Sequence, residues 1–192
     1  MMIRLGTLLA ALAVTISSQA EWMLDSSNST LKFVSTKSNS VSEIHHFEAM
    51  TGTISDDGKA TLVIDLVSVE TNIPIRNERM QTMLFNVADY AKATITTVVD
   101  MSELDNADIG GIYSIINDVT VDLHGNQKTY STKLTVMKMS EDKVVIVASE
   151  PVIVNAADFG LEAGIEKLRE VAGLPAIATS VPLSFVLVYN QK

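Results

Sequence analysis

The stretch that decides the fold is residues 64–95, "IDLVSVETNIPIRNERMQTMLFNVADYAKATI", which interrupts an otherwise strand-like pattern. Residues 59–70 and 92–101 alternate apolar and polar side chains with the period of two that is typical of strands. Between them, Pro74 suits the first turn of a helix, and Ile75 and Met83 fall on one helical face. The stretch therefore predicts a short helix near residues 74–84 between two strands.

The same alternation recurs along most of the chain and predicts an all-β protein. Turn signals such as Asp57-Gly58 separate the segments and favour hairpins. Long antiparallel strands in a meander favour a closed barrel, because closure removes the exposed edges. The sequence thus predicts an extended, eight-stranded antiparallel β-barrel. Its predicted strands are residues 29–37, 47–55, 59–70, 92–101, 112–125, 128–139, 143–154 and 178–189.

A second helix is predicted near residues 161–172. Leu161, Ile165 and Leu168 share one helical face, and charged side chains occupy the other. Gly173 and Pro175 follow in the order that ends a helix. This helix is expected to close an end of the barrel or to pack on its outside.

The first twenty residues read as a signal peptide. Arg4 gives a positive start, an apolar run follows, and small residues Ser18 and Ala20 precede the expected cleavage point after Ala20. The run is too short for an ordinary spanning helix, although an uncleaved anchor is the alternative. We expect residues 1–20 to be removed and residues 21–192 to form one exported, periplasmic domain that is not an integral membrane protein.

Composition excludes several classes of function. The formal net charge of −9 disfavours nucleic-acid binding, which needs a basic patch. There is no cysteine, so disulfides, thiolate metal sites and cysteine nucleophiles are absent from the chain. Common hydrolase, zinc-protease and nucleotide motifs are missing from the sequence, so we expect neither an enzyme nor a metal site. Adjacent residues His45 and His46 would point to opposite faces of a strand.

The decisive stretch resembles the signature of the YceI-like family of polyisoprenoid-binding exported proteins. The matching elements are Ser68 and Thr71 at a strand end, Arg76 in a polar turn, and the run 84–87 followed by a tyrosine. Segments 121–128, "VDLHGNQK", and 155–160, "NAADFG", resemble later motifs of the family. Asn77 stands where the family often has aspartate, and a basic residue usually found before the Asp158-Phe159 pair is missing.

The resemblance implies a lipocalin-like barrel whose elongated apolar cavity binds a polyprenyl or quinone-type chain, with no other cofactor. An eight-stranded barrel is either filled by its own side chains or open for one small ligand, and the sequence leaves both outcomes open. A filled barrel would instead act through its surface, as an envelope stress or interaction protein. The inward positions expected from the pattern are Phe33, Phe47, Leu62, Ile64, Ile95, Val119, Val121, Leu134, Val136, Phe185 and Leu187.

The inserted segment 72–87 is predicted to lie beside the barrel mouth. Its apolar residues Met83, Leu84 and Phe85 would seal the tube, and Arg76 and Asn77 are candidates for contact with a polar head group. Apolar mouths of this kind are often covered by a second copy, so a homodimer is a further expectation. Hydrolysis or isomerisation of an isoprenoid is a third hypothesis, for which the sequence offers no nucleophile–base pair.

Overall fold

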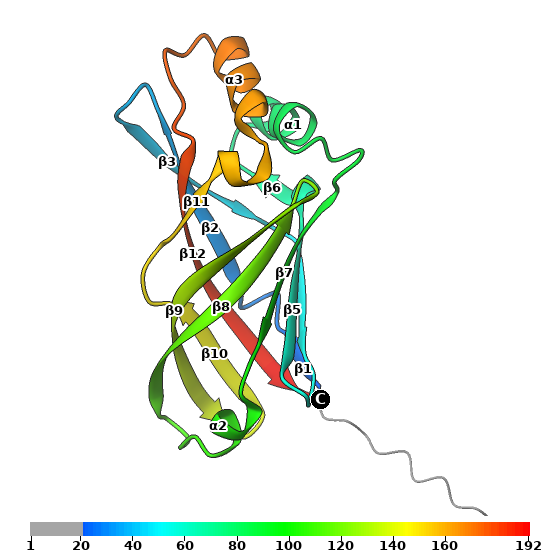
Figure 1. Cartoon of the computed structure of the whole chain (residues 1–192), viewed down its shortest axis with the longest axis vertical. Coiled ribbons are helices and arrows are strands. Elements are labelled where there is room, and N and C mark those ends of the chain that lie inside the picture. Colours follow the sequence, from blue (N-terminus) through cyan, green and yellow to red (C-terminus); the bar gives the residue numbers. More distant parts are fainter. Residues whose placement is uncertain (1–20) are drawn as a thin grey trace, which may run out of the picture.

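The computed structural model describes residues 21–192, and the predicted signal peptide lies outside that range. Figure 1 shows an elongated barrel with helices at both ends. The helices are α1 (Pro74–Arg79), α2 (Met101–Asp105) and α3 (Glu162–Val171), with short helical turns η1 (Leu66–Ser68), η2 (Met80–Leu84) and η3 (Ala156–Phe159). The strands are β1 (Trp22–Leu24), β2 (Thr30–Lys37), β3 (Val41–Phe47), β4 (Met50–Ile54), β5 (Lys59–Asp65), β6 (Val69–Glu70), β7 (Lys92–Val98), β8 (Ile112–Leu123), β9 (Asn126–Ser140), β10 (Lys143–Ala148), β11 (Val152–Asn155) and β12 (Ser180–Gln191).

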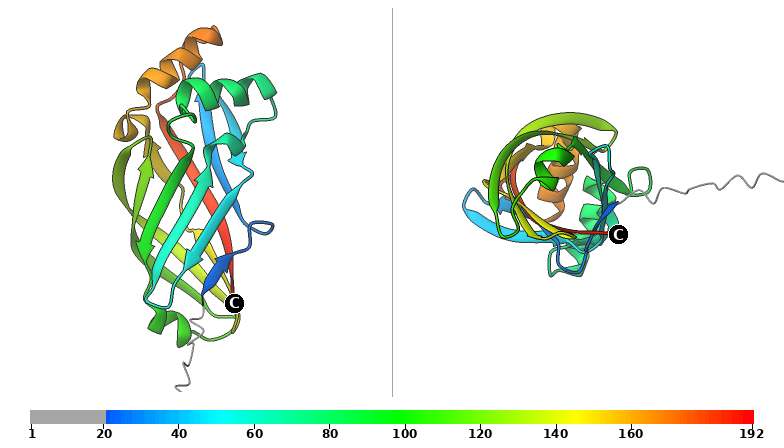
Figure 2. Two further views of the ribbon diagram at one scale, coloured as in Figure 1. Left: turned by 90° about the vertical axis from the view of Figure 1, so that its right-hand side faces the viewer. Right: turned by 90° about the horizontal axis from the view of Figure 1, so that it is seen from below.

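Eight strands close into a ring, which confirms the predicted antiparallel barrel. The order is β1-β4-β5-β7-β8-β9-β10-β12, and antiparallel pairing of β1 with β12 completes the circle. Seen from below, the strands form a ring, and α2 lies across its lower end (Figure 2). Closure removes the unpaired edges that would invite association with other strands.

A second set of strands lengthens the wall above the ring. The first half of β12 pairs with β2 on one side and with β11 on the other. β3 pairs with β2, and β6 pairs with β3. The additional wall carries the α1 and α3 end of the molecule, opposite the end that holds α2 (Figures 1 and 2).

Both predicted helices are present. α1 begins at Pro74 and runs directly into η2, a single π-helical turn, and together they span the predicted 74–84. α3 falls within the predicted 161–172 and ends before Gly173, whose φ of 64° is the left-handed conformation that glycine adopts without strain. The two segments touch at Gly164, where an added Cβ would lie 2.8 Å from the Met83 carbonyl oxygen.

The structure departs from the predicted elements in several places. β1 was not among the eight predicted strands, and the predicted strand 59–70 is interrupted by η1, which separates β5 from β6. Residues 41–47 form a strand, β3, although Glu43, His45 and His46 weaken its apolar pattern. The predicted strand 143–154 is broken around Pro151 into β10 and β11, since proline has no backbone N–H for a ladder. α2 was not expected, and it follows directly after β7.

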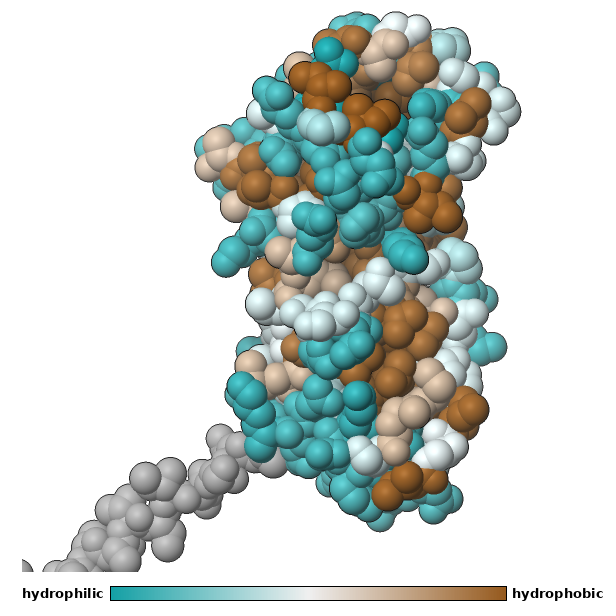
Figure 3. All heavy atoms as spheres, turned by 180° about the vertical axis from the view of Figure 1, so that it is seen from behind, coloured by the Kyte–Doolittle hydropathy of each residue, from teal (hydrophilic) through white to brown (hydrophobic). Residues whose placement is uncertain are grey.

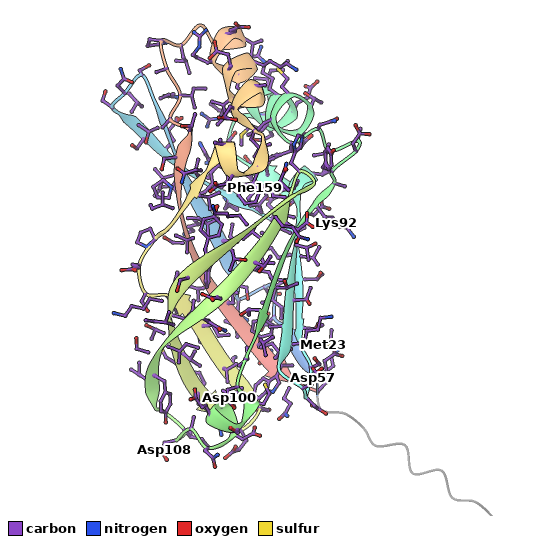
Figure 4. All side chains as sticks on the ribbon, viewed as in Figure 1. Met23, Asp57, Lys92, Asp100, Asp108 and Phe159 are labelled. Carbon is purple, nitrogen blue, oxygen red and sulfur yellow. The ribbon has the colours of Figure 1, made fainter. Side chains whose placement is uncertain are left out.

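The hydrophobic core lies along the inner face of the wall. One cluster follows the barrel and includes Trp22, Ile54, Leu66 and Val144. A smaller one centres on the fully buried Phe159 beneath α3 (Figure 4). Within residues 21–192, no helix is long and apolar enough to cross a membrane.

Candidate functional site

The interior of the barrel is hollow and not filled. A cavity of about 750 Å³ runs inside the ring, within the size range of ligand sites in proteins. Strand alternation builds its wall: Ala60, Leu62 and Ile64 of β5 all point inward beside Ile95 of β7. The sequence-predicted residues that line it are Phe47, Leu62, Ile64, Phe85, Ile95, Val119, Val121, Leu134, Val136, Phe185 and Leu187.

Other predicted residues lie away from the cavity lining. Phe33 is buried against His45 and Phe47, with ring centroids 5.4 and 5.5 Å apart, in the additional wall above the ring. Met83 and Leu84 belong to the η2 turn that meets Gly164 of α3. Those residues pack the helices onto the barrel end. Within the inserted segment it is the next residue, Phe85, that reaches the cavity and packs against Phe47.

Arg76 and Asn77 are bonded within the protein and do not line the cavity. Arg76 donates to the Glu43 carboxylate at 2.7 Å and to the Thr71 carbonyl at 2.6 Å. The Asn77 side-chain oxygen accepts from the Thr71 amide at 2.9 Å, and its nitrogen donates to Glu70 at 2.9 Å. This network fastens α1 to the ends of β3 and β6.

The charges around Arg76 affect the protonation of two neighbouring side chains, Glu43 and His45. Hydrogen bonding from Lys37, supported by Arg76, lowers the pKa of the Glu43 carboxyl. Burial, with the nearby charge of Arg76, lowers the pKa of the His45 imidazole. Glu43 is therefore held ionised and His45 is held neutral near pH 7, which is consistent with a structural role for this cluster.

The sequence reasoning missed the end of the cavity that α2 forms. Val98, Asp100 and Glu103 line it from the β7–α2 junction, and Tyr113 and Asn117 line it from β8. The helix itself had a readable signal: Asp100 accepts from the backbone N–H groups of Ser102 at 2.9 Å and Glu103 at 3.4 Å. An aspartate three residues before a glutamate is a variant of the capping pattern that starts helices.

The cavity reaches the surface at a gap between β7 and β8. These strands pair only from Thr94 to Thr96, whereas β8 and β9 pair along the whole of β8. Below that point Asn117 donates to the Val98 carbonyl at 3.0 Å, and the strands then separate. Val98 and Ile116 border the gap, 69% and 75% exposed, yet both line the cavity. We call this opening, bounded by β7, α2 and β8, the α2 mouth.

A buried lysine holds α2 over the barrel end. Lys138 of β9 is nearly inaccessible, and its ammonium donates to the Asp105 carbonyl at the last residue of α2 at 3.2 Å. It also lies 3.2 Å from the exposed carboxylate of Glu141. A positive charge at the carboxyl end of a helix is favourable, so Lys138 fixes the position of α2. Asp100 and Asp108 mark the beginning of α2 and the loop that follows it in Figure 4.

Two tyrosine hydroxyls are further polar features of the cavity lining. Burial raises the pKa of Tyr189 to about 12, and burial together with the Asp158 carboxylate raises the pKa of Tyr130 to about 12. The phenol of Tyr130 donates to Asp158 at 3.2 Å. Both tyrosines are therefore neutral at physiological pH. Outside, the back face mixes hydrophilic with hydrophobic residues (Figure 3).

Comparisons with known proteins agree with this architecture. Residues 22–189 match the model of the YceI-like domain. A solved polyisoprenoid binding domain from Saccharophagus degradans, implicated in plant cell wall breakdown, is 42% identical and covers 89% of this chain and 98% of its own, with a TM-score of 0.88. None of the curated proteins matches the chain.

More distant structures share the fold alone. BcnA from Burkholderia cenocepacia has a TM-score of 0.66 at 19% identity, covering 86% of this chain and 98% of its own. The YceI protein of Campylobacter jejuni has a TM-score of 0.55 at 17% identity, covering 77% of this chain and 84% of its own. From the barrel, its cavity and the match over residues 22–189, the chain belongs to the YceI-like family.

Proposed function

We propose that this protein is an exported carrier that binds an isoprenoid chain in the barrel cavity and releases it unchanged. The observation that carries the proposal is the hollow interior: a cavity of about 750 Å³ inside a closed β-wall, walled mainly by aliphatic and aromatic side chains. The 42% identical relative described as a polyisoprenoid binding domain supports the choice of ligand.

The energetics favour a long apolar chain over a compact ligand. Each buried methylene contributes about 0.8 kcal/mol, so every five-carbon isoprene unit contributes about 4 kcal/mol before the costs of association. An elongated cavity gives each added unit further wall to contact, up to the length of the tube. The methyl-branched chain would lie among Leu62, Ile64, Leu134 and Val136, whose branched side chains present a continuous apolar surface.

The export part of the proposal rests on the sequence of residues 1–20. Cell fractionation of the tagged full-length chain, with mass spectrometry of the mature N-terminus, tests it. A mature N-terminus at Glu21 in the periplasmic fraction is the expected result. Retention of residues 1–20 in a membrane fraction would support the uncleaved anchor.

Organic extraction of the protein purified from its native compartment tests binding directly. We expect one apolar isoprenoid per chain by mass spectrometry, and we expect the stripped protein to take up added polyprenol or quinone. Absence of any bound lipid together with no uptake would refute the proposal. Recovery of chemically altered lipid after incubation would instead indicate an enzyme.

Homodimer formation stays a prediction. Light scattering with size-exclusion chromatography, on the loaded and the stripped protein, measures it. A mass of one chain in both states would contradict it.

A further inference from the structure

The polar lining of the cavity is concentrated at one end. Higher in the barrel the main polar group of the lining is the phenol of Tyr130, which lies beside Val119. At the α2 mouth, carboxylate, amide and phenol groups gather within one turn of helix and the adjacent part of β8. A chain with one polar end would therefore place that end at the α2 mouth and its tail toward α1 and α3.

The charged side chains that line the cavity are all acidic. Among residues 21–192, no lysine, arginine or histidine lines the cavity, while Asp100 and Glu103 do. The nearest buried cation, Lys138, does not line the cavity, because its ammonium is turned to the Asp105 carbonyl and to Glu141. The first backbone N–H groups of α2 are not available for an anion, since the Asp100 carboxylate already accepts from them. The mouth would repel a phosphate.

The neutral groups at the mouth retain hydrogen-bonding capacity. The Tyr113 oxygen accepts from the Asp108 amide at 2.7 Å, which leaves the phenol proton to donate elsewhere. Asn117 uses its nitrogen on the Val98 carbonyl, which leaves its side-chain oxygen as an acceptor. A phenol donor and an amide acceptor suit a hydroxyl or carbonyl head group.

We infer that the cavity selects isoprenoids with an uncharged head group, held at the α2 mouth, and discriminates against prenyl phosphates and diphosphates. The inference deepens the proposed function and rests on it. Asp100 and Glu103 supply the discrimination by electrostatic repulsion, and Tyr113 and Asn117 supply the positive contacts. Like charges at the edge of a low-dielectric cavity repel more strongly than they would in open water.

Matched ligands provide the test. The dissociation constants of geranylgeraniol and geranylgeranyl diphosphate are measured on the lipid-stripped mature chain by titration calorimetry, below the micelle concentration of either ligand. We expect the diphosphate to bind at least about tenfold more weakly at low salt, with the gap narrowing as salt screens the charges. Glu103→Gln is expected to reduce the ratio of the two dissociation constants about threefold or more. Glu162→Gln, which removes the same charge from the exposed face of α3, is the matched control and should leave the ratio unchanged.

The measurements are repeated with EDTA and with Mg²⁺, because a divalent ion could bridge a diphosphate to the carboxylates. Equal binding of the two ligands in either condition would overturn the inference while leaving the proposed function standing. Equal reduction of the ratio by Glu103→Gln and Glu162→Gln would also overturn it, since the effect would then come from net charge alone. Binding of neither ligand would refute the proposed function, and the inference with it.

Discussion

A plug at Ala60 is the sharpest test of the cavity. Ala60 is buried on β5 with its side chain toward the lumen, opposite Ile54 on one neighbouring strand and Thr97 on the other. The segment from Ala60 to Leu66 follows the cavity wall toward the α1 and α3 end. At about 3.3 Å per residue and a strand tilt of about 40°, it corresponds to about 15 Å of tube. The Ala60→Trp side chain should block the cavity at Ala60, so that a tail entering from the α2 mouth cannot reach the part of the tube beyond it.

The expected loss of affinity follows from the cavity contacts that the ligand tail can no longer make. Excluding a single five-carbon unit removes about 4 kcal/mol of gross burial, or nearly a thousandfold in the dissociation constant. Partial accommodation by bending the chain recovers some of this, so we expect Ala60→Trp to weaken polyprenol binding at least a hundredfold. Because the new side chain enters empty space, the stability of the lipid-free protein should change by less than about 1.5 kcal/mol.

Displacement of a fluorescent prenyl probe measures the affinity, and thermal unfolding of the stripped protein measures the stability. Thr51→Trp, on the exposed outer face of β4, is the matched control and should bind normally. If Ala60→Trp unfolds the protein, Ile146→Trp introduces the same bulk from β10, four places further round the ring. Tight binding by a folded plug variant would refute the assignment of the lumen as the binding site.

Three further predictions concern the scaffold. Burial raises the pKa of Tyr189 from about 10 to about 12, so its contribution to the free energy of unfolding is complete below pH 10. Between pH 10 and 12 the tyrosine ionises more readily in the unfolded chain than in the folded one, and about 2–3 kcal/mol of stability should be lost. Urea titrations measure this loss, which Tyr189→Phe should not show. Phe159→Ala empties a fully buried site under α3 and should lower the free energy of unfolding by about 3–5 kcal/mol in denaturant titrations, and a loss below 1 kcal/mol would contradict its place in the core. Alanine usually stabilises a helix relative to glycine, but Gly164→Ala should destabilise this protein by about 1–3 kcal/mol, because the added Cβ would clash with the η2 backbone. A gain in thermal stability would show that α3 and η2 are not so closely packed.

The sequence predicted the fold well where local pattern and global closure agree. β5 alternates cleanly, because one of its sides faces the apolar lumen and the other faces water. The inserted helix and α3 carry their own start and stop residues, Pro74 and Gly173. β3 escaped prediction because a carboxylate and two histidines interrupt its apolar pattern. Glu43 bonds with Arg76, while His45 packs against Phe33.

The candidate site was only partly readable from sequence. Alternation predicted many of the inward residues, because register fixes which side chains face the lumen. Whether the lumen is empty depends on how far apart opposite walls stand, and that distance comes from the number and tilt of the strands. The position of the α2 mouth depends on where the pairing of β7 with β8 ends, and no local pattern in either strand predicts that point.

The last strand ties the whole molecule together. β12 bonds with β1, β2, β10 and β11, and its pairing with β1 joins Trp22 to Gln191. Contacts between residues so distant along the chain form late and slowly in folding. A polypeptide emerging from the ribosome can therefore form hairpins but cannot close the barrel until the residues of β12 are available. In a chain proposed to be exported, the contact that closes the barrel is therefore also the one that needs the whole polypeptide, so the enclosed cavity is completed last.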